Sequence, residues 1–214
     1  PSSPLVFGRL GDVRLVFLAR HGAHHQLAPH RVNYRANLWA LRQVGAQQVL
    51  GINSVGGIRA DLRPGILAVP DQIIDYTWGR SGTFDEQGEA LQHVDFTDPY
   101  SSALRSRLFT AAGQMGIDLA EGGCYGVTQG PRLETRAEIT RLRRDGCDLV
   151  GMTGMPETAL ARELGLDYAC LAIVANWAAG CDLEQRKISF TEVKSIVVKA
   201  SAGLPGLLAA LLRD

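Results

Sequence analysis

The sequence predicts an α/β protein, a single domain in which a mixed, largely parallel β-sheet is flanked by helices. Apolar, strand-like runs alternate with helical patterns through the second half of the chain, which is typical of βαβ units. The chain has 214 residues, of which 46% are apolar and 21% charged, and these values fit one globular domain with a sizeable core.

Each element of this domain has its own signal. Apolar runs predict strands over residues 13–19, 48–53, 66–74, 124–128, 148–152 and 168–175, with a bend at Pro70. Helical spacing of apolar residues predicts helices over 35–44, 101–115, 133–144, 157–164 and 191–212, the last broken near Gly203 and Pro205. Residues 75–99 are polar and glycine-containing, which predicts a long loop or an irregular excursion, of the kind that is either functional or mobile in a compact domain.

Charge and hydropathy exclude several classes of function. The 22 basic residues balance the 22 acidic ones, so nothing indicates a nucleic-acid or membrane partner, and a neutral surface favours self-association. No apolar run reaches the roughly 20 residues that span a bilayer. The first four residues lack both signal-peptide features and an initiator Met, which indicates that upstream residues are missing.

The cysteines and histidines predict no metal. The loop histidines His24, His25 and His30 have no acidic or cysteine partners at ligand spacing. The cysteines also lack metal-ligand spacing, and three of them lie in or beside apolar runs, as free thiols do in a reducing cytoplasm. The four cysteines are Cys124, Cys147, Cys170 and Cys181, and the first three are those in or beside the apolar runs.

Polar residues stand at the ends of several predicted strands. Arg20 and His21 follow the first strand, Asn53 opens the Gly-rich stretch 53–57, and Thr153 follows the strand at 148–152. Because strand ends line the ligand crevice of an open α/β sheet, these donors predict an anion pocket. Two alternatives remain: Arg20 pairs with a surface acid, or residues 53–57 form an ordinary turn.

A second polar pair is suited to a heterocycle. Glu134 falls at the start of a predicted helix and Asn176 at the end of a predicted strand. A carboxylate accepts hydrogen bonds and an amide both donates and accepts, so the pair fits the edge of a purine base. Capping of a helix by Glu134 and of a turn by Asn176 are the simpler alternatives.

Motifs spread over much of the chain point to one family. They are Leu-Ala-Arg-His-Gly at 18–22, Val-Asn-Tyr-Arg-Ala-Asn at 32–37, Gln-Gly-Pro-Arg at 129–132, Arg-Ala-Glu at 136–138 and Gly-Met-Thr-Gly-Met-Pro-Glu at 151–157. In this order they resemble the trimeric purine nucleoside phosphorylases, and most closely the methylthioadenosine and methylthioinosine phosphorylases. The resemblance covers essentially the whole chain and implies the nucleoside phosphorylase fold, a homotrimer, and no cofactor besides phosphate as co-substrate.

The resemblance also implies roles at the phosphate end. Phosphate attacks the anomeric carbon through an oxocarbenium-like transition state, so positioning and electrostatic stabilisation suffice and no covalent nucleophile is needed. Met152 would lie against the ribosyl group. Asn53 stands where relatives carry Thr or Tyr. The phosphate-binding residues implied are Arg20, His21, Asn53, the backbone of Ser54 and Thr153, with His21 and Asn176 as catalytic residues.

The base end favours a 6-oxopurine. Adenine-specific relatives place Asp at the positions of Asn176 and Ala178, whereas this chain pairs Asn176 with Glu134 as 6-oxopurine enzymes do. An amide donates to the purine oxygen, and a buried polar mismatch discriminates strongly. The resemblance places Leu133 in the same substrate pocket.

The sugar end favours a methylthio group. Ordinary inosine and guanosine phosphorylases present a His to the ribose hydroxyl, while this chain offers Phe190 and Val193. Their alternative role is the packed face of the final helix. His93, in the long polar loop, matches a residue that relatives lend across the subunit boundary to this pocket.

Together these features predict phosphorolysis of S-methyl-5′-thioinosine to hypoxanthine and 5-methylthioribose 1-phosphate. The alternatives are a phosphorylase of inosine or guanosine, a methylthioadenosine phosphorylase, and a nucleoside-binding or scaffold protein without catalysis. Family members also carry an N-terminal Gly-rich turn whose hydroxyl residue grips phosphate, and Pro1 corresponds to a point downstream of that turn.

Overall fold

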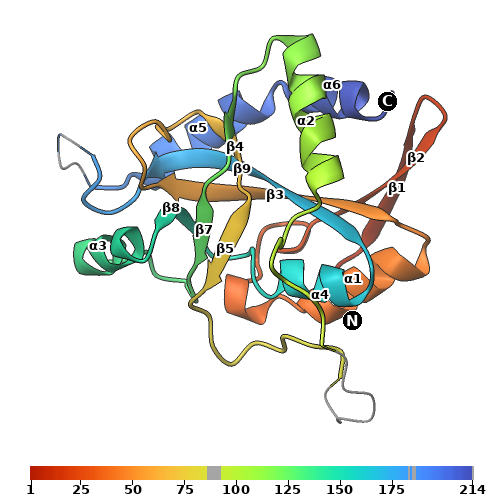
Figure 1. Ribbon diagram of the computed structural model, residues 1–214, viewed down its shortest axis with the longest axis horizontal. Helices are drawn as coiled ribbons and strands as arrows, with labels where there is room; N and C mark the ends of the chain where they lie inside the picture. Colours follow the sequence, from red (N-terminus) through yellow and green to blue (C-terminus); the bar gives the residue numbers. More distant parts are fainter. Residues whose placement is uncertain (86–92, 183, 185–186, 214) are drawn as a thin grey trace.

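A seven-stranded sheet crosses the centre of the molecule, with helices on both faces (Figure 1). The structure is a computed structural model that describes residues 1–85, 93–182, 184 and 187–213. The strand order is β5-β7-β8-β3-β9-β4-β6, and a separate hairpin, β1-β2, stands beside this sheet. The strands are β1 (Leu5–Leu10), β2 (Val13–Leu18), β3 (Gln48–Gly57), β4 (Leu67–Val69), β5 (Gln72–Asp75), β6 (Leu119–Glu121), β7 (Cys124–Val127), β8 (Cys147–Gly151) and β9 (Asp167–Trp177).

The pairing of the strands confirms the predicted mixed, largely parallel sheet. β3 runs parallel to β9, β7 parallel to both β5 and β8, and β4 parallel to β6. Within the seven-stranded sheet, as far as the structure describes it, only the contacts of β3 with β8 and of β4 with β9 are antiparallel. Strands β1 and β6 were not predicted, and the bend at Pro70 separates β4 from β5, which lie far apart in the sheet.

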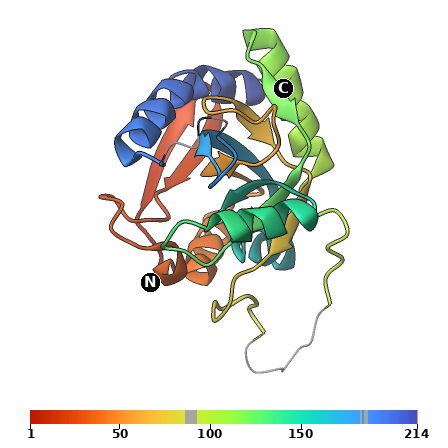
Figure 2. The ribbon, with the colours of Figure 1, turned by 90° about the vertical axis from the view of Figure 1, so that its left-hand side faces the viewer.

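The helices divide between the two faces of the sheet. α1 (Tyr34–Gln43) packs on α4 (Glu157–Glu163) on one face, and α2 (Ser102–Met115) packs on α6 (Leu204–Leu211) on the other. α5 (Phe190–Ser201) leads into α6, and the two arch over the sheet (Figure 2). α3 (Arg136–Arg144) packs on β8. The predicted helices over 35–44, 101–115 and 157–164 are confirmed.

The core contains two large clusters, one on each face of the sheet, and a smaller third cluster that includes Ile139 and Leu142 of α3. The first includes Leu38 of α1 and Leu160 of α4, and the second Leu108 of α2 and Leu207 of α6, all at most 2% exposed. The segment Phe190–Leu211 has the length and mean hydropathy, 1.3, of a membrane-spanning helix. In this fold α6 packs into the second cluster, so its apolar residues have a place in the core.

The predicted strand over 13–19 forms as β2, but it is not the buried strand that its apolar run indicates. β2 pairs only with β1, and this hairpin projects from the body of the molecule (Figure 1). Phe7 and Phe17 are 66% and 63% exposed. A hairpin with apolar residues on both faces has the same composition as a buried strand, so the apolar run alone does not distinguish the two.

The Gly-rich stretch after Asn53 is not a turn. β3 continues through Gly57, and its pairing with β9 shifts register at Val55 and Gly56, which marks a bulge. Glycine is required at 57 because a Cβ there would lie 1.9 Å from the carbonyl oxygen of Leu62. The prediction of an anion-binding turn at a strand end is therefore wrong, and Asn53 lies in the middle of a strand.

The start of α3 differs from the predicted helix over 133–144. Thr135 caps this helix by accepting a hydrogen bond from the backbone N–H of Glu138, and the Glu138 carboxylate accepts from the N–H of Thr135. This capping box begins the helix at Arg136. Glu134 therefore does not cap the helix and is free for another role.

Candidate active site

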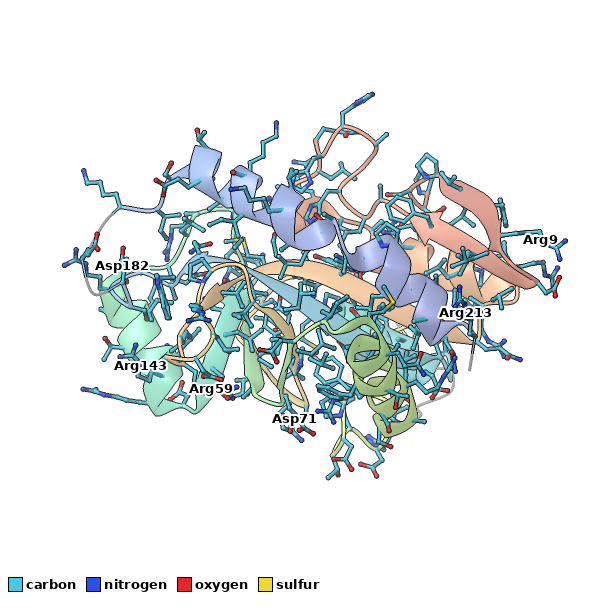
Figure 3. All side chains as sticks on the ribbon, turned by 90° about the horizontal axis from the view of Figure 1, so that it is seen from above. Arg9, Arg59, Asp71, Arg143, Asp182 and Arg213 are labelled. Carbon is cyan, nitrogen blue, oxygen red and sulfur yellow. The ribbon has the colours of Figure 1, made fainter. Side chains whose placement is uncertain are left out.

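One cavity of about 1630 Å³ runs along β3 between the hairpin and the C-terminal helices. Its volume exceeds the range of roughly 300 to 1,000 Å³ that holds a small ligand. Part of the excess lies along β3, whose edge from Gln48 to Val55 pairs with β9 on one side and with no described strand on the other. Figure 3 shows Arg59, Asp71 and Arg143 at the outer rim of the molecule, and none of them lines this cavity.

The cavity brings together every predicted site residue except His93. Its lining includes the residues predicted to bind phosphate, Arg20, His21, Asn53, Ser54 and Thr153, and those predicted to bind the nucleoside, Leu133, Glu134, Met152, Asn176, Phe190 and Val193. In the register of β3 and β9, Asn53 lies opposite Ala172, four residues before Asn176. That offset amounts to about 13 Å along the strand, which leaves room for a sugar between the level of Asn53 and that of Asn176.

Asn53 is a buried amide without a protein partner. It is 2% exposed, and neither its Nδ2 nor its Oδ1 atom has a hydrogen-bond partner among the described residues. Buried amides are normally hydrogen-bonded, so two unsatisfied atoms at a cavity wall indicate a polar ligand. Thr153, 7% exposed, lines the same cavity.

Arg20 forms a two-pronged ion pair with Glu157. Its Nε donates to Oε2 of Glu157 at 2.8 Å and its NH2 to Oε1 at 2.6 Å, while its NH1 donates to the carbonyl oxygen of Ile52 at 3.0 Å. Burial alone would lower the pKa of Arg20, but the Glu157 charge raises it above its ordinary value. The alternative of a surface acid is wrong, because Glu157 is 4% exposed.

His21 is held in one tautomer. Its Nδ1 lies 2.8 Å from the carbonyl oxygen of Leu27, and because a carbonyl only accepts, Nδ1 carries the proton. Burial lowers the pKa of His21, and the neighbouring His25, whose ring centroid lies 4.4 Å away, lowers it further, while the Leu27 carbonyl raises it. In the neutral ring Nε2 is therefore an acceptor, suited to the remaining O–H of a hydrogen phosphate dianion.

Glu134 and Asn176 each keep hydrogen-bonding capacity for a ligand. The Thr128 hydroxyl donates to Oε1 of Glu134 at 2.5 Å, which leaves Oε2 as an acceptor. Nδ2 of Asn176 donates to the carbonyl oxygen of Trp177 at 2.7 Å, which leaves one N–H and Oδ1. Asn176 lies within β9, so its predicted alternative as a turn cap is wrong.

Phe190 and Val193 give the cavity an apolar wall. Both come from the first turn of α5, where Ser189 caps the helix by accepting from the N–H of Glu192. Phe190 is 73% exposed, so it is not part of a packed helix face. Met152 packs against Gly130, and a Cβ at position 130 would lie 2.4 Å from the sulfur of Met152. The loop after β7 therefore fixes the position of the Met152 side chain.

His93 is exposed and does not line the cavity of its own chain. Part of the predicted long loop, residues 86–92, lies outside the described residues. Among the described residues, no group of three or more His, Cys, Asp or Glu side chains is placed to hold a metal ion.

Two residues beside the site have roles that were not predicted. The sequence pattern placed Glu157 only at the start of a predicted helix. The pattern that could have indicated its buried role is an acidic residue among the apolar residues of a short helix. Arg80, in the polar loop, donates to the carbonyl oxygens of Met152, Met155 and Gln129 at 2.6 to 2.8 Å. A single Arg in a loop carries no sequence signal for such contacts.

Comparison with known protein families identifies the fold. The family model described as the phosphorylase superfamily matches residues 1–213. This chain belongs to the phosphorylase superfamily. The family predicted from the motifs spread along the chain is thereby confirmed.

Curated relatives place the chain among the nucleoside phosphorylases. A probable S-methyl-5′-thioinosine phosphorylase from Xanthomonas campestris is 61% identical over 214 residues, which cover 100% of this chain and 85% of the relative. A 6-oxopurine nucleoside phosphorylase from Pyrococcus furiosus is 42% identical, with 97% of this chain and 80% of the relative covered.

A solved structure shares the whole fold. Methylthioadenosine phosphorylase from Schistosoma mansoni, in complex with adenine, superposes with a TM-score of 0.93 and 33% identity, covering 100% of this chain and 80% of that one. The chain is thus an enzyme of the nucleoside phosphorylase type, a pentosyltransferase.

Proposed function

We propose that this protein catalyses the phosphorolysis of S-methyl-5′-thioinosine, releasing hypoxanthine and 5-methylthioribose 1-phosphate. The observation that carries the proposal is the composition of one cavity, which combines anion-binding donors, a carboxylate and amide pair, and an apolar wall. The 61% identical relative named a probable S-methyl-5′-thioinosine phosphorylase supports it.

At the phosphate end, Arg20, Asn53, Thr153 and the backbone of Ser54 hold the dianion, and Nε2 of His21 accepts its O–H. The unsatisfied amide of Asn53 and the fixed tautomer of His21 support this assignment. Phosphate then attacks the anomeric carbon as the bond to the purine breaks, and catalysis comes from positioning and electrostatic stabilisation.

At the base end, Asn176 donates its remaining N–H to the oxygen of the 6-oxopurine and stabilises the negative charge that develops on the leaving base. Oε2 of Glu134 accepts from a ring N–H. The hydrogen bond from Thr128 supports this role, because it orients the carboxylate before substrate binds.

At the sugar end, Phe190 and Val193 bury the methylthio group, Met152 contacts the ribosyl ring and Leu133 lines the base side of the pocket. A thioether cannot hydrogen-bond well, so an apolar wall favours it over a hydroxyl. The second candidate is a phosphorylase of inosine or guanosine, which the 42% identical 6-oxopurine relative favours.

The protein acts as a cytoplasmic homotrimer in purine salvage, with no metal or cofactor beyond the co-substrate phosphate. The trimer completes the sugar pocket with His93 from a neighbouring subunit, a role that suits an exposed residue outside its own cavity. Size-exclusion chromatography with light scattering tests the trimer. A His93→Ala variant tests the cross-subunit contact by its effect on the KM for nucleoside.

The test of the reaction is purine release from methylthioinosine, with and without phosphate, using protein that includes any residues upstream of Pro1. Hypoxanthine release that requires phosphate supports the proposal. Binding without phosphate-dependent release would favour the non-catalytic alternative.

A further inference from the structure

Three elements that are distant in sequence converge on the Arg20 guanidinium. Arg20 follows β2, Glu157 begins α4, and Tyr168 lies near the start of β9. The Tyr168 hydroxyl donates to Oε1 of Glu157 at 2.8 Å, and Oε1 also accepts from Arg20. All three side chains are largely buried: Glu157 is 4% and Tyr168 3% exposed, and the side chain of Arg20 is 14% exposed.

The contacts leave a defined part of Arg20 for a ligand. A guanidinium has five N–H donors, of which two are taken by Glu157 and one by the carbonyl oxygen of Ile52. Two N–H groups remain, on a side chain that lines the cavity. The two-pronged contact with Glu157 fixes the plane of the guanidinium and so fixes where these two N–H groups point.

Gly51 of β3 leaves the space in which Tyr168 and Glu157 meet. A Cβ on Gly51 of β3 would lie 2.0 Å from the Tyr168 hydroxyl oxygen and 3.3 Å from Oε1 of Glu157. The absence of a side chain at Gly51 therefore lets the Tyr168 hydroxyl reach the carboxylate. Burial raises the pKa of Tyr168 well above its ordinary value, and the Glu157 charge raises it further, so the hydroxyl remains a donor.

We propose that Glu157, supported by Tyr168, is a positioning residue for phosphate, which orients the two remaining N–H groups of Arg20 toward the bound anion. This inference rests on the proposed function, because it takes phosphate as the ligand of Arg20. A carboxylate next to a phosphate site repels the anion. Glu157 therefore favours phosphate binding by orienting Arg20 and not by its own charge.

Charge and orientation predict opposite results for Glu157→Gln. If Arg20 acts only as a positive charge, removing the opposing carboxylate tightens phosphate binding. If Glu157 positions Arg20, the amide nitrogen of Gln faces an Arg donor, the two-pronged contact is lost, and phosphate binding weakens. We expect the KM and Kd for phosphate to rise on the order of tenfold or more, with the KM for nucleoside changed less than about twofold.

Two further variants keep the test interpretable. Tyr168→Phe removes only the supporting hydroxyl, and we expect a smaller rise in the phosphate Kd, about threefold. This variant still tests the inference if Glu157→Gln fails to fold. Asp61→Asn is the matched control, because it breaks the two-pronged pair of Arg59 with Asp61 (2.6 and 3.0 Å), which does not line the cavity. It leaves the phosphate Kd unchanged.

The experiment is calorimetric titration of the full-length wild type and these variants with inorganic phosphate, followed by phosphate and nucleoside KM values. Weaker phosphate binding in both network variants, with an unchanged nucleoside KM, supports the inference. Equal or tighter phosphate binding in the variants, while the wild type binds phosphate and cleaves nucleoside, overturns the positioning role and leaves the proposed function standing. A wild type that does not bind phosphate overturns both.

Discussion

The NH1 group of Arg80 donates to the carbonyl oxygen of Met152 at 2.8 Å and so ties the polar loop at residues 75–99 to the active-site edge of the sheet. The same guanidinium contacts the carbonyl oxygens of Met155 and Gln129, and it lies over the ring of Tyr34, 5.6 Å from its centroid. One side chain thus joins the loops that follow β7 and β8, and these loops carry Glu134 and Thr153.

Replacement of Arg80 by Lys should loosen both loops. An ammonium has three donors and cannot match the planar fork of Arg, so partly buried carbonyl groups lose partners at a cost of about 1 to 3 kcal/mol. We expect the free energy of unfolding to fall by that amount and the KM for nucleoside to rise. Urea denaturation and steady-state kinetics measure the two effects. Arg63→Lys, at an exposed position outside the cavity, should change neither, and equal behaviour of the two variants would rule out this role for Arg80.

Asn176→Asp should change the preferred base. A carboxylate accepts from the amino group of adenine and repels the oxygen of hypoxanthine, so the ratio of kcat/KM for methylthioinosine to that for methylthioadenosine should fall by about tenfold or more. Asn33→Asp is a matched control, because Asn33 caps α1 outside the cavity and Asp caps equally well. An unchanged ratio in Asn176→Asp would show that this residue does not select the base.

Phe190→Ala should reduce the preference for a methylthio group. Burial of a methyl or methylene group contributes about 0.8 kcal/mol, so the loss of the aromatic wall should lower kcat/KM for methylthioinosine by about fourfold. Inosine, with a hydroxyl in that place, should be affected less than twofold. Val198→Ala, on the same helix but outside the cavity, should have no effect. Equal losses for both substrates in Phe190→Ala would contradict the apolar pocket.

The stability of the protein should fall below pH 6.5 through His21. Because burial lowers the pKa of His21 in the folded state, the unfolded chain takes up the proton first as the pH falls. The contribution of neutral His21 is therefore complete above its ordinary pKa of about 6.5 and is lost as the pH falls toward the lower folded value. Denaturation at pH 7.5 and 5.5 should show a smaller pH dependence in His21→Gln than in the wild type. The same dependence in both proteins would exclude His21 as the titrating group.

Leu108→Ala tests the packing of α2 on α6. Leu108 is fully buried in the cluster that contains Leu207, so the substitution should cost about 2 to 5 kcal/mol of unfolding free energy. Gln114→Ala, on the exposed side of the same helix, should change stability by less than about 0.5 kcal/mol. A loss below 1 kcal/mol in Leu108→Ala would mean that this face is not the core.

The sequence was sufficient for the fold class and for most of the residues that line the cavity, because both depend on local patterns. Buried strands such as β8 and β9 are continuous apolar runs, and the residues at or near their ends need only the topology of the sheet to meet. The sequence pattern therefore predicted that Thr153 and Asn176 would meet at one edge of the sheet, and both line the cavity.

The remaining features depend on tertiary contacts that have no local signal. The continuation of β3 through two glycines follows from the close approach of the Leu62 carbonyl oxygen to Gly57. The exposure of β2 follows from its pairing with β1 alone. The roles of Glu157 and Arg80 depend on partners far away in the sequence, 137 residues in the case of Arg20 and Glu157.

The most direct test of the proposed function is a comparison of purine release from methylthioinosine, methylthioadenosine and inosine, each with and without phosphate. We predict phosphate-dependent release that is fastest from methylthioinosine and yields hypoxanthine. Fastest release from inosine would contradict the apolar pocket at Phe190 and Val193, fastest release from methylthioadenosine would contradict base selection by Asn176, and no release from any substrate would contradict the proposed reaction itself.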